Sequence, residues 1–474
     1  MHQAAAPVPS RHSHERKPWT LLVLLAVAQF MVILDITVVN VALPSIRHDL
    51  GFAPGDLQWV VTTYVLFTGG LLLLGGRVAD MLGRRPVFLA GLVLFTAASL
   101  ASGLASTPAA LVVSRGAQGL GAALLSPAAL SIITTTYTGQ QRTTALSAWG
   151  AIGAGGAAAG VLLGGILTTW LGWESVFFIN VPIGVATALL ATRLVPARSE
   201  RDGSLRELDL AGAATLVSGL VVLVYGVEGA ARHGWASAQT IVLLAAAAVV
   251  LAMHVAIERR SERPLIPPAT WEVRSLVSSA AVMLGTTGIL VGTFFLNSLF
   301  LQNVLGSSAL ETGLAFLPLV LVIGLAAHAG PHLLDHLGAR IVVVAGLVLI
   351  AGAELLLSRV GAGANYFANL LPAFLPLGFG IGLVFVSVSV TAMSDIEGER
   401  AGLASGLMTT AHEIGGAFGV SIFSAVALAG GSTLAHGYGH GALAGAILAA
   451  GMAVVAALAV PAVRPAPGTH VAAH

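Results

Sequence analysis

Long apolar segments alternate with short polar loops along almost the whole chain. Each segment ends at charged residues or at Gly and Pro breaks, and about 20 apolar residues suffice for a helix to cross a hydrocarbon core of ~30 Å. Fourteen such segments are predicted, at 19–43, 57–77, 86–105, 108–131, 143–167, 174–195, 209–229, 238–258, 272–301, 311–334, 340–358, 367–391, 401–429 and 441–462. The pattern predicts an all-α integral membrane protein with fourteen transmembrane helices.

Composition agrees with this interpretation. Of the 474 residues, 56% are hydrophobic and only 9% are charged, whereas soluble domains carry about 25% charged residues. The mean hydropathy is +0.91. The apolar run that begins at Trp19 continues to Val41 without a clear small-residue cleavage site. We therefore expect a retained first helix and not a cleaved signal peptide.

The loop charges predict the orientation in the membrane. Of the 22 Lys and Arg residues, Arg115 lies within a span, and only Arg47, Arg232 and Arg359 fall in the odd-numbered loops. The other 18 lie in the even-numbered loops and the terminal segments. Because positive charges are retained on the cytoplasmic side, both termini are expected in the cytoplasm of a multi-pass plasma membrane protein. The abundance of Ala, Gly and Arg suggests a bacterial source.

Several function classes receive no support from the sequence. The formal net charge is +1 and the chain has no cysteine, so neither nucleic acid binding nor thiolate chemistry is expected. Gly-x-Ser-x-Gly, Walker-type and His-Glu-x-x-His signals are also absent. From the sequence we therefore expect a protein that is not an enzyme and that has no catalytic residue, metal site or cofactor. Without a nucleotide site, uphill transport has to use an ion gradient.

A repeat divides the chain into two halves. Gly75, Asp80, Gly83 and Arg85 recur 255 residues later as Gly330, Asp335, Gly338 and Arg340. A second repeat relates Gly119, Gly121 and Ser126 to Gly380, Gly382 and Ser387, with an offset of 261. Parallel repeats of this kind build transporters that alternate access between two halves. Coincidence among Gly-rich segments is the alternative.

The repeat and the loop composition predict five regions. They are a cytoplasmic tail (1–18), an N-terminal six-helix bundle (19–195), a linker with two inserted helices (196–262), a C-terminal six-helix bundle (263–462) and a second tail (463–474). The polar stretch Pro196 to Glu207 is the expected linker into the inserted pair.

Four motifs carry a family resemblance. They are Gly-Gly-Arg-Val-Ala-Asp-Met-Leu-Gly-Arg-Arg at 75–85, Leu-Asp-Ile-Thr-Val-Val-Asn-Val-Ala-Leu-Pro at 34–44, Arg-Gly-Ala-Gln-Gly-Leu-Gly at 115–121 and Phe-Phe-Ile-Asn-Val-Pro-Ile-Gly at 177–184. From about Leu34 through its C-terminal half, the chain resembles the major facilitator superfamily, and within it the fourteen-helix drug:proton antiporters. The resemblance implies two six-helix bundles with two extra helices between them. It also implies that Asp80, Arg84 and Arg85, with Asp335 and Arg340, form a charge lock that stabilises the outward-facing state.

The fifth span departs from the family pattern at one position. Gly156, Gly160, Gly164 and Gly165 match the antiporter motif, but Val161 stands where that motif has proline. Proline bends a helix and removes a backbone donor. The substitution keeps an uptake permease open as an alternative function.

Charged residues within spans are expensive and are functional hypotheses by default. Asp35 lies about 24 Å from the cytoplasmic face and Arg115 about 10 Å below the outer face at ~1.5 Å per residue, so both occupy the outer half of the membrane. We expect the pair to form and break during the cycle, with Asp35 taking up a proton outside and releasing it inside. A static salt bridge that orders two helices is the alternative.

Two further acids lie within predicted spans. Glu413, followed by Gly415 and Gly416, is expected to serve as a second protonation site or as a counter-ion for a cationic substrate, with a paired acid inside the bundle as the alternative. For Glu354 the surrounding residues favour a helix-packing role. Phenylalanines cluster in the C-terminal half, and packing is favoured for them over a drug-binding wall.

The sequence favours a monomeric, proton-coupled exporter of hydrophobic, including cationic, drugs or antibiotics across a lipid bilayer. A metabolite uptake permease and a lipid translocator on the same fold remain alternatives. The substrate itself cannot be read from the sequence.

Overall fold

The computed structural model describes residues 18–195 except Pro54, together with 209–261, 264–396, 401–430 and 433–462. The expected linker at Pro196 to Glu207 and most of both tails lie outside the described residues. Within the described ranges, helices are the only regular elements.

The N-terminal half contains α1 (Pro18–Leu50), α2 (Trp59–Leu82), α3 (Arg84–Gly103), α4 (Pro108–Thr136), α5 (Gly139–Leu171), the single turn α6 (Ser175–Phe178) and α7 (Asn180–Leu194). The inserted pair is α8 (Leu210–His233) and α9 (Ala238–Arg260). The C-terminal half contains α10 (Arg274–Asn303), α11 (Ala309–Leu337), α12 (Ala339–Leu357), α13 (Leu371–Met393), α14 (Ala401–Ala429) and α15 (Leu434–Ala459). A 3-10 helix (Pro268–Glu272) precedes α10, and a π-helical turn (Tyr366–Leu370) precedes α13.

Among the described residues, 14 helical segments are long and apolar enough to cross a membrane, which confirms the predicted number. The boundaries differ most for the last span, which begins at Leu434 and not at 441. Its first two turns carry histidines and glycines that look like a loop in the sequence, but the Thr433 side chain accepts the N–H of His436 and caps the helix. The first span also continues through Pro44 to Leu50.

The two halves have the same packing plan. In the N-terminal half, the main pairs are α1 with α5, α2 with α4, α3 with α4 and α3 with α7. In the C-terminal half, they are α10 with α14, α11 with α13, α12 with α13 and α12 with α15. Helix for helix, α1 to α5 and α7 correspond to α10 to α15. The halves also meet reciprocally, since α2 packs on α14 and α11 packs on α5.

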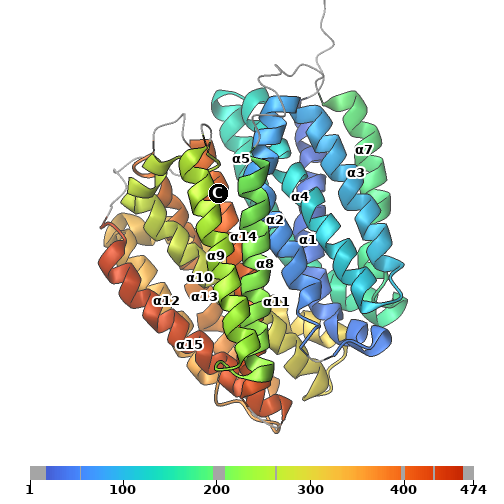
Figure 1. Ribbon diagram of the computed structural model, residues 1–474, viewed down its shortest axis with the longest axis vertical. Helices are drawn as coiled ribbons and strands as arrows, with labels where there is room; N and C mark the ends of the chain where they lie inside the picture. Colours follow the sequence, from blue (N-terminus) through green and yellow to red (C-terminus); the bar gives the residue numbers. More distant parts are fainter. Residues whose placement is uncertain are drawn as a thin grey trace, which may run out of the picture.

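The inserted helices lie against the junction of the two halves. Helix α8 packs on both α2 and α14, and α9 packs mainly on α8 (Figure 1). Trp59 of α2 donates its indole N–H to Glu228 of α8 at 2.7 Å. The insert therefore covers one of the two reciprocal contacts between the halves.

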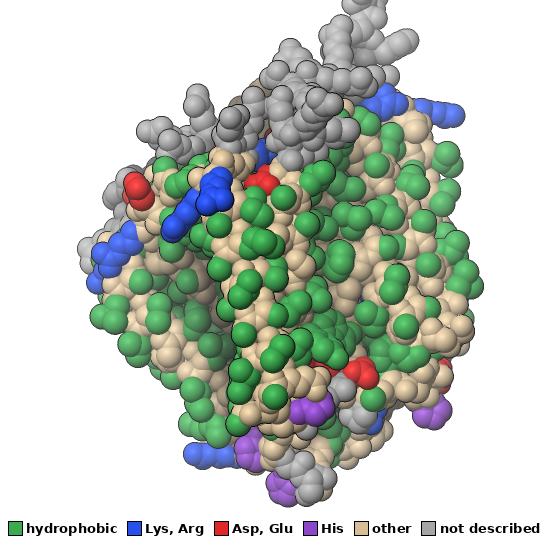
Figure 2. All heavy atoms as spheres, in the orientation of Figure 1, with side chains coloured by type: hydrophobic (Ala, Val, Ile, Leu, Met, Phe, Trp, Pro, Cys, Tyr) green, Lys and Arg blue, Asp and Glu red, His purple; other side chains and the backbone are tan. Residues whose placement is uncertain are grey.

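We call the end of the bundle where α1 begins and α15 ends the terminal end, and the other end the distal end. In Figure 2 most of the visible Lys and Arg side chains lie toward the terminal end, and histidines gather at the distal end. At the terminal end, Gly83 links α2 to α3 and Gly338 links α11 to α12. Both have positive φ, of 101° and 81°, a conformation that favours glycine.

Candidate functional site

Asp35 of α1 and Arg115 of α4 meet in the interior of the N-terminal half. The Nη1 atom of Arg115 donates to Oδ2 of Asp35 and, at 2.7 Å, to Oε1 of Gln118. Asp35, Arg115 and Gln118 are all 0% exposed. A buried ion pair of this kind is stable only when further hydrogen bonds satisfy the rest of both groups.

The second carboxylate oxygen of Asp35 has two amide donors. Gln118 Nε2 donates to Asp35 Oδ1 at 2.7 Å, and Asn180 Nδ2 of α7 donates to the same atom at 2.9 Å. Both amides also reach the hydroxyl oxygen of Ser99 on α3, at 2.6 and 3.2 Å. Four helices thus contribute side chains to one carboxylate site, which we call the Asp35 network (Asp35, Ser99, Arg115, Gln118 and Asn180).

Helix α2 and the α6 turn complete the surroundings of Arg115. Its Nε atom donates to the carbonyl oxygen of Val60 at 2.9 Å. The guanidinium carbon lies 4.2 Å from the ring centre of Tyr64 and 5.6 Å from that of Phe177. Aromatic faces attract a cation, and more strongly where water is excluded. The site is therefore built to hold one positive and one negative charge together in an apolar interior.

The sequence predicts the pairing of Asp35 with Arg115 but not the part played by Ser99, and it marks Gln118 and Asn180 only as motif residues. All three are polar residues in apolar spans. Gln118 follows Arg115 by three residues and so lies on the same helix face, which is the available signal. The positions of Ser99 and Asn180 depend on how α3 and α7 pack, and the sequence does not give this.

Glu413 lies outside the Asp35 network. It is half-buried on α14, where its Cβ packs directly over Gly69 of α2. Among the described residues, it forms no hydrogen bond or ion pair. Tyr64 is close enough to Asp35, Arg115 and Glu413 to interact electrostatically with all three. Tyr64 therefore lies between the network and the acid on the opposite half.

The charge lock that the resemblance implies stays a prediction. Asp80 lies 3.9 Å from Arg84, and both side chains are substantially exposed, where an ion pair contributes little. Asp335 is exposed, and no ion pair involves it in the described part of the chain. The charge lock remains a prediction for another conformation of the protein.

The arginines of the two motif copies instead hold equivalent helix ends. Arg85 donates to the carbonyl oxygen of Thr192 at the end of α7. Arg340 donates to that of Val460, directly after α15, at 2.7 Å. The sequence repeat is thus a repeat of contacts as well.

The motif glycines mark close helix approaches. A Cβ atom at Gly75 would lie 2.0 Å from the carbonyl oxygen of Ala123 on α4, and one at Gly330 would lie 3.2 Å from the side chain of Val386 on α13. These positions are equivalent in the two halves, and the approach is closer in the first.

The glycines of the fifth span form the contacts of α5. Gly156, Gly160 and Gly164 face α1, and a Cβ at Gly160 would lie 1.7 Å from Oγ1 of Thr37. Gly165 faces α11 of the other half, where a Cβ would lie 2.8 Å from the carbonyl oxygen of Ala309. Val161, which replaces the motif proline, is fully buried in the same contact with α11.

Several phenylalanines of the C-terminal half pack in its core. Phe316 is fully buried and stacks between Phe294 and Phe374, with ring centres 4.5 and 6.0 Å away. Phe295 and Phe300 are also buried. These contacts agree with the packing role favoured from the sequence.

Comparison with known proteins assigns the family. A family model described as "Major Facilitator Superfamily" matches residues 25–420. The chain belongs to the major facilitator superfamily. It is a membrane transporter and not an enzyme. Its fourteen spanning helices and its bacterial relatives identify it as a multi-pass plasma membrane protein of bacterial type.

Relatives of this chain include proteins named for antibiotic export and antibiotic resistance. The chain is 40% identical to the cephamycin export protein of Amycolatopsis lactamdurans, over 92% of this chain and 91% of that one. It is 39% identical to the puromycin resistance protein of Streptomyces alboniger, over 92% and 87%. The crystal structure of the human organic anion transporter MFSD10 shares the fold, with a TM-score of 0.63 and 15% identity over 93% of this chain and 99% of that one.

Proposed function

We propose that this transporter exports hydrophobic antibiotics or drugs, including cationic ones, from the cytoplasm in exchange for protons. The similarity to cephamycin and puromycin export and resistance proteins supports the direction and the substrate class. The single observation that carries the coupling is the Asp35 network, because it places one proton-accepting group in contact with one fixed cation inside a sealed interior.

The orientation follows from the charges. On the face shown in Figure 2, most of the visible Lys and Arg side chains lie toward the terminal end. Under the positive-inside rule, the terminal end faces the cytoplasm and the distal end faces outside. The N- and C-terminal tails are then both cytoplasmic.

The two halves contact each other toward both ends of the bundle. Near the distal end, Ser298 of α10 donates to the carbonyl oxygen of Asn40 at 2.6 Å, and Gln302 donates to that of Val41 at 2.9 Å. Toward the terminal end, Gly406 of α14 faces α2, where an added Cβ atom would lie 2.8 Å from the side chain of Leu73. We infer that the halves exchange contacts of this kind as they rock against each other, which provides alternating access.

Coupling follows from the charge balance of the Asp35 network. A proton on Asp35 neutralises the carboxylate and leaves Arg115 without its anion, while the amides of Gln118 and Asn180 lose their strongest acceptor. Charge-assisted hydrogen bonds are roughly twice as strong as neutral ones. Protonation of Asp35 therefore loosens the contacts among α1, α4 and α7 and favours the opposite conformation. We infer that Glu413, which interacts electrostatically with Tyr64, binds the cationic group of a substrate.

Proton-driven transport of ethidium in inside-out vesicles tests this function. With an imposed pH gradient, acidic in the lumen, the wild type should accumulate ethidium, and Asp35→Asn should abolish the accumulation. Asp49→Asn is the matched control, since Asp49 lies exposed on the same helix and, among the described residues, contacts only Trp173, which donates at 3.1 Å, and neighbouring His48. Accumulation by Asp35→Asn at the wild-type rate would contradict the coupling role. Gradient-driven loss of ethidium from the lumen would instead indicate an uptake permease.

A further inference from the structure

A second buried acid lies in the C-terminal half. Glu354 of α12 is 0% exposed. One carboxylate oxygen accepts the hydroxyl hydrogen of Thr293 on α10. The other oxygen, Oε2, has no hydrogen-bond partner among the described residues, and it faces Gly445 of α15, where a Cβ would lie 3.0 Å away.

The position of this acid matches that of the Asp35 network in the other half. Thr293 follows Asp35 by 258 residues, and Glu354 follows Ser99 by 255. These offsets agree with those of the repeated motifs, and the helices correspond in the packing plan. Both halves therefore carry one acid and one hydroxyl at these two positions, with the acid on the first helix in one half and on the third in the other. Thr293 binds Glu354 directly, whereas Ser99 is connected to Asp35 through the amides of Gln118 and Asn180.

A third residue of the Asp35 network, Asn180, also has a counterpart in the C-terminal half. Tyr438 of α15 follows Asn180 by 258 residues, and its hydroxyl donates to Oδ1 of Asn297 at 2.9 Å. Asn297 in turn donates to the carbonyl oxygen of Thr293 at 2.9 Å. A continuous chain of hydrogen bonds thus connects Tyr438 to the residue that binds Glu354. All these side chains are buried.

Arg115 of the Asp35 network has no counterpart on the equivalent helix of the C-terminal half. At the offset of the fourth helix, Arg115 and Gln118 correspond to Pro376 and Phe379, and α13 contains no titratable side chain. Of the other titratable groups on the surrounding helices, Tyr438 of α15 is the one close enough to Glu354 to interact with it electrostatically. The others on these helices are Arg274 and Arg340 at the terminal end, His436 and His440 on α15, Tyr366, and Glu311, His328, His332, Asp335 and His336 on α11. Among the described residues, Glu354 forms no ion pair.

An isolated carboxylate in an apolar interior is far costlier than a neutral acid. A group with one hydroxyl donor, no cation and an unused oxygen is therefore suited to hold a proton in this conformation. Salt-bridge formation, the usual reason for a buried acid, does not apply here.

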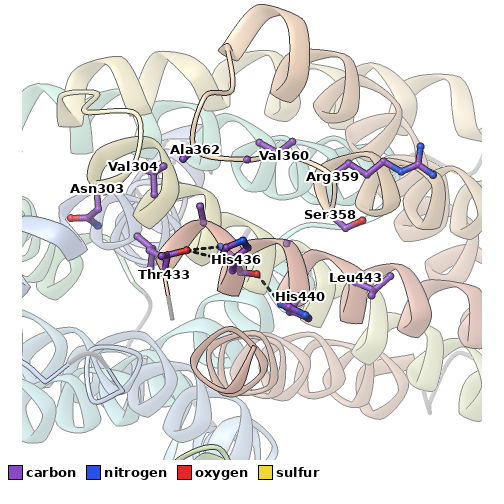
Figure 3. Close-up of a pocket in the computed structure, with 14 residues that line it drawn as sticks. Asn303, Val304, Ser358, Arg359, Val360, Ala362, Thr433, His436, His440 and Leu443 are labelled. Carbon is purple, nitrogen blue, oxygen red and sulfur yellow. Dashed lines mark hydrogen bonds between the residues drawn. The ribbon is translucent and has the colours of Figure 1, made fainter. Parts of the chain in front are cut away.

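A cavity of about 760 Å³ lies at the distal end of the C-terminal half (Figure 3). Ser358, which lines it, is one helical turn from Glu354 and donates its N–H to the Glu354 carbonyl at 2.9 Å. His436 and His440 also line it and use their Nδ1 atoms in bonds to Thr433 and to the His436 carbonyl, each at 2.9 Å. Imidazole nitrogens donate and accept hydrogen bonds, so the cavity presents polar groups to water on the distal side.

We propose that Glu354 is a second proton-binding site, the C-terminal counterpart of Asp35, loaded from this cavity. The proton moves from water in the cavity to Oε2 and changes the carboxyl charge from −1 to 0. It leaves to water on the terminal side when the halves rock. This inference deepens the proposed proton coupling and rests on it. It predicts that two protons cross for each substrate exported.

Two measurements test the site, and the first needs no transport. Infrared spectra of the purified protein at neutral pH should contain a protonated carboxyl C=O band that Glu354→Gln lacks. Glu311→Gln, an exposed helix-capping acid in the same half, should leave the band unchanged. Thr293→Val should shift the band without removing it, which covers the case in which Glu354→Gln does not fold. A band that is absent in the wild type, or unchanged in Glu354→Gln, would overturn the proposal.

The second measurement counts protons. In proteoliposomes, simultaneous recording of lumenal pH and ethidium movement gives the number of protons exchanged per substrate. Glu354→Gln should halve this number and Glu311→Gln should not change it, and an unchanged number in Glu354→Gln would overturn the proposal. If the wild type moves ethidium without protons, the proposed antiport fails, and the infrared band alone then decides whether Glu354 binds a proton.

Discussion

The two halves of this transporter share a packing plan but differ in the charge balance of their polar centres. In the N-terminal half, Asp35 accepts from Arg115, Gln118 and Asn180, so an ionised carboxylate is fully compensated. In the described part of the C-terminal half, Glu354 accepts only from Thr293. One ancestral arrangement can thus hold a charge in one copy and a neutral acid in the other, depending on whether the fourth helix supplies an arginine.

The difference also bears on how each centre responds to a proton. A proton on Asp35 removes an ion pair that joins α1 to α4, so it changes the contacts between helices. A proton on Glu354 removes no ion pair, so it is carried with little structural consequence. The N-terminal centre is therefore suited to switching, and the C-terminal centre to proton transport.

The largest expected loss of stability comes from a substitution in the Asp35 network of the N-terminal half. Arg115→Met leaves Asp35 buried without its cation, and breaking a buried ion pair costs about 3–5 kcal/mol. Thermal unfolding in detergent should show a strongly reduced Tm. Combining it with Asp35→Asn should restore much of the loss, because the buried charge is then gone. A double variant as unstable as Arg115→Met would show that Arg115 acts through packing and not through charge.

A substitution of the buried acid in the C-terminal half should change the stability of the protein only slightly. Glu354→Gln replaces a neutral acid with an amide of similar shape, so the free energy of unfolding should change by about 1 kcal/mol or less. Asp35→Asn alone, which leaves Arg115 unpaired, should be clearly less stable than Glu354→Gln. Equal losses in the two variants would contradict the distinction between a charged and a neutral centre.

Equivalent glycines in the two halves allow the α1–α5 contact to be compared with the α10–α14 contact. Gly160 of α5 and Gly419 of α14 lie 259 residues apart, and added Cβ atoms would lie 1.7 Å from the Thr37 side chain and 1.9 Å from the Gly288 carbonyl, respectively. Overpacking typically costs about 1–3 kcal/mol. A side chain can rotate away and a carbonyl cannot, so Gly419→Ala should lower the Tm more than Gly160→Ala.

Gly402→Ala is the control for that pair, since nothing lies within 4 Å of its added Cβ. The reverse order of the Gly160 and Gly419 variants would show that the α1–α5 contact is the more rigid of the two.

The smallest effect is expected at the paired arginines of the loop motif. Arg85→Ala and Arg340→Ala each remove a hydrogen bond to the end of an equivalent helix, α7 or α15. Such a bond contributes about 0.5–1.5 kcal/mol. The hydrogen bond of Arg340 is partly buried and that of Arg85 is exposed, so the loss of Arg340 should lower the Tm slightly more. No effect from either variant would indicate that these bonds do not stabilise the helix ends.

Much of the fold could be predicted from the sequence, because crossing a membrane leaves a long apolar signal for each helix. The number of spans, the repeat and the family follow from that signal and from the loop motifs. The sequence places the start of α15 too late, because His436 and His440 look like loop residues when the Thr433 cap and the neighbouring helices are unknown.

The candidate site could be predicted only in part. Asp35 and Arg115 stand out because charges in apolar spans are rare, but Ser99 is an ordinary hydroxyl until α3 packs beside α1. The hydrogen bonds of Gln118 and Asn180 likewise depend on tertiary contacts. For Glu354 the sequence favours a packing role, because its unused carboxylate oxygen becomes visible only once α10, α12 and α15 are assembled.

The central claim is that Asp35 couples protons to transport and does not simply bind substrate or hold helices together. Proteoliposomes can measure two activities of one preparation: ethidium exchange at equal pH, and ethidium accumulation driven by a pH gradient. The account predicts that Asp35→Asn retains exchange but loses gradient-driven accumulation, whereas Asp49→Asn retains both. Gradient-driven accumulation that survives in Asp35→Asn would contradict it, as would the loss of exchange together with accumulation.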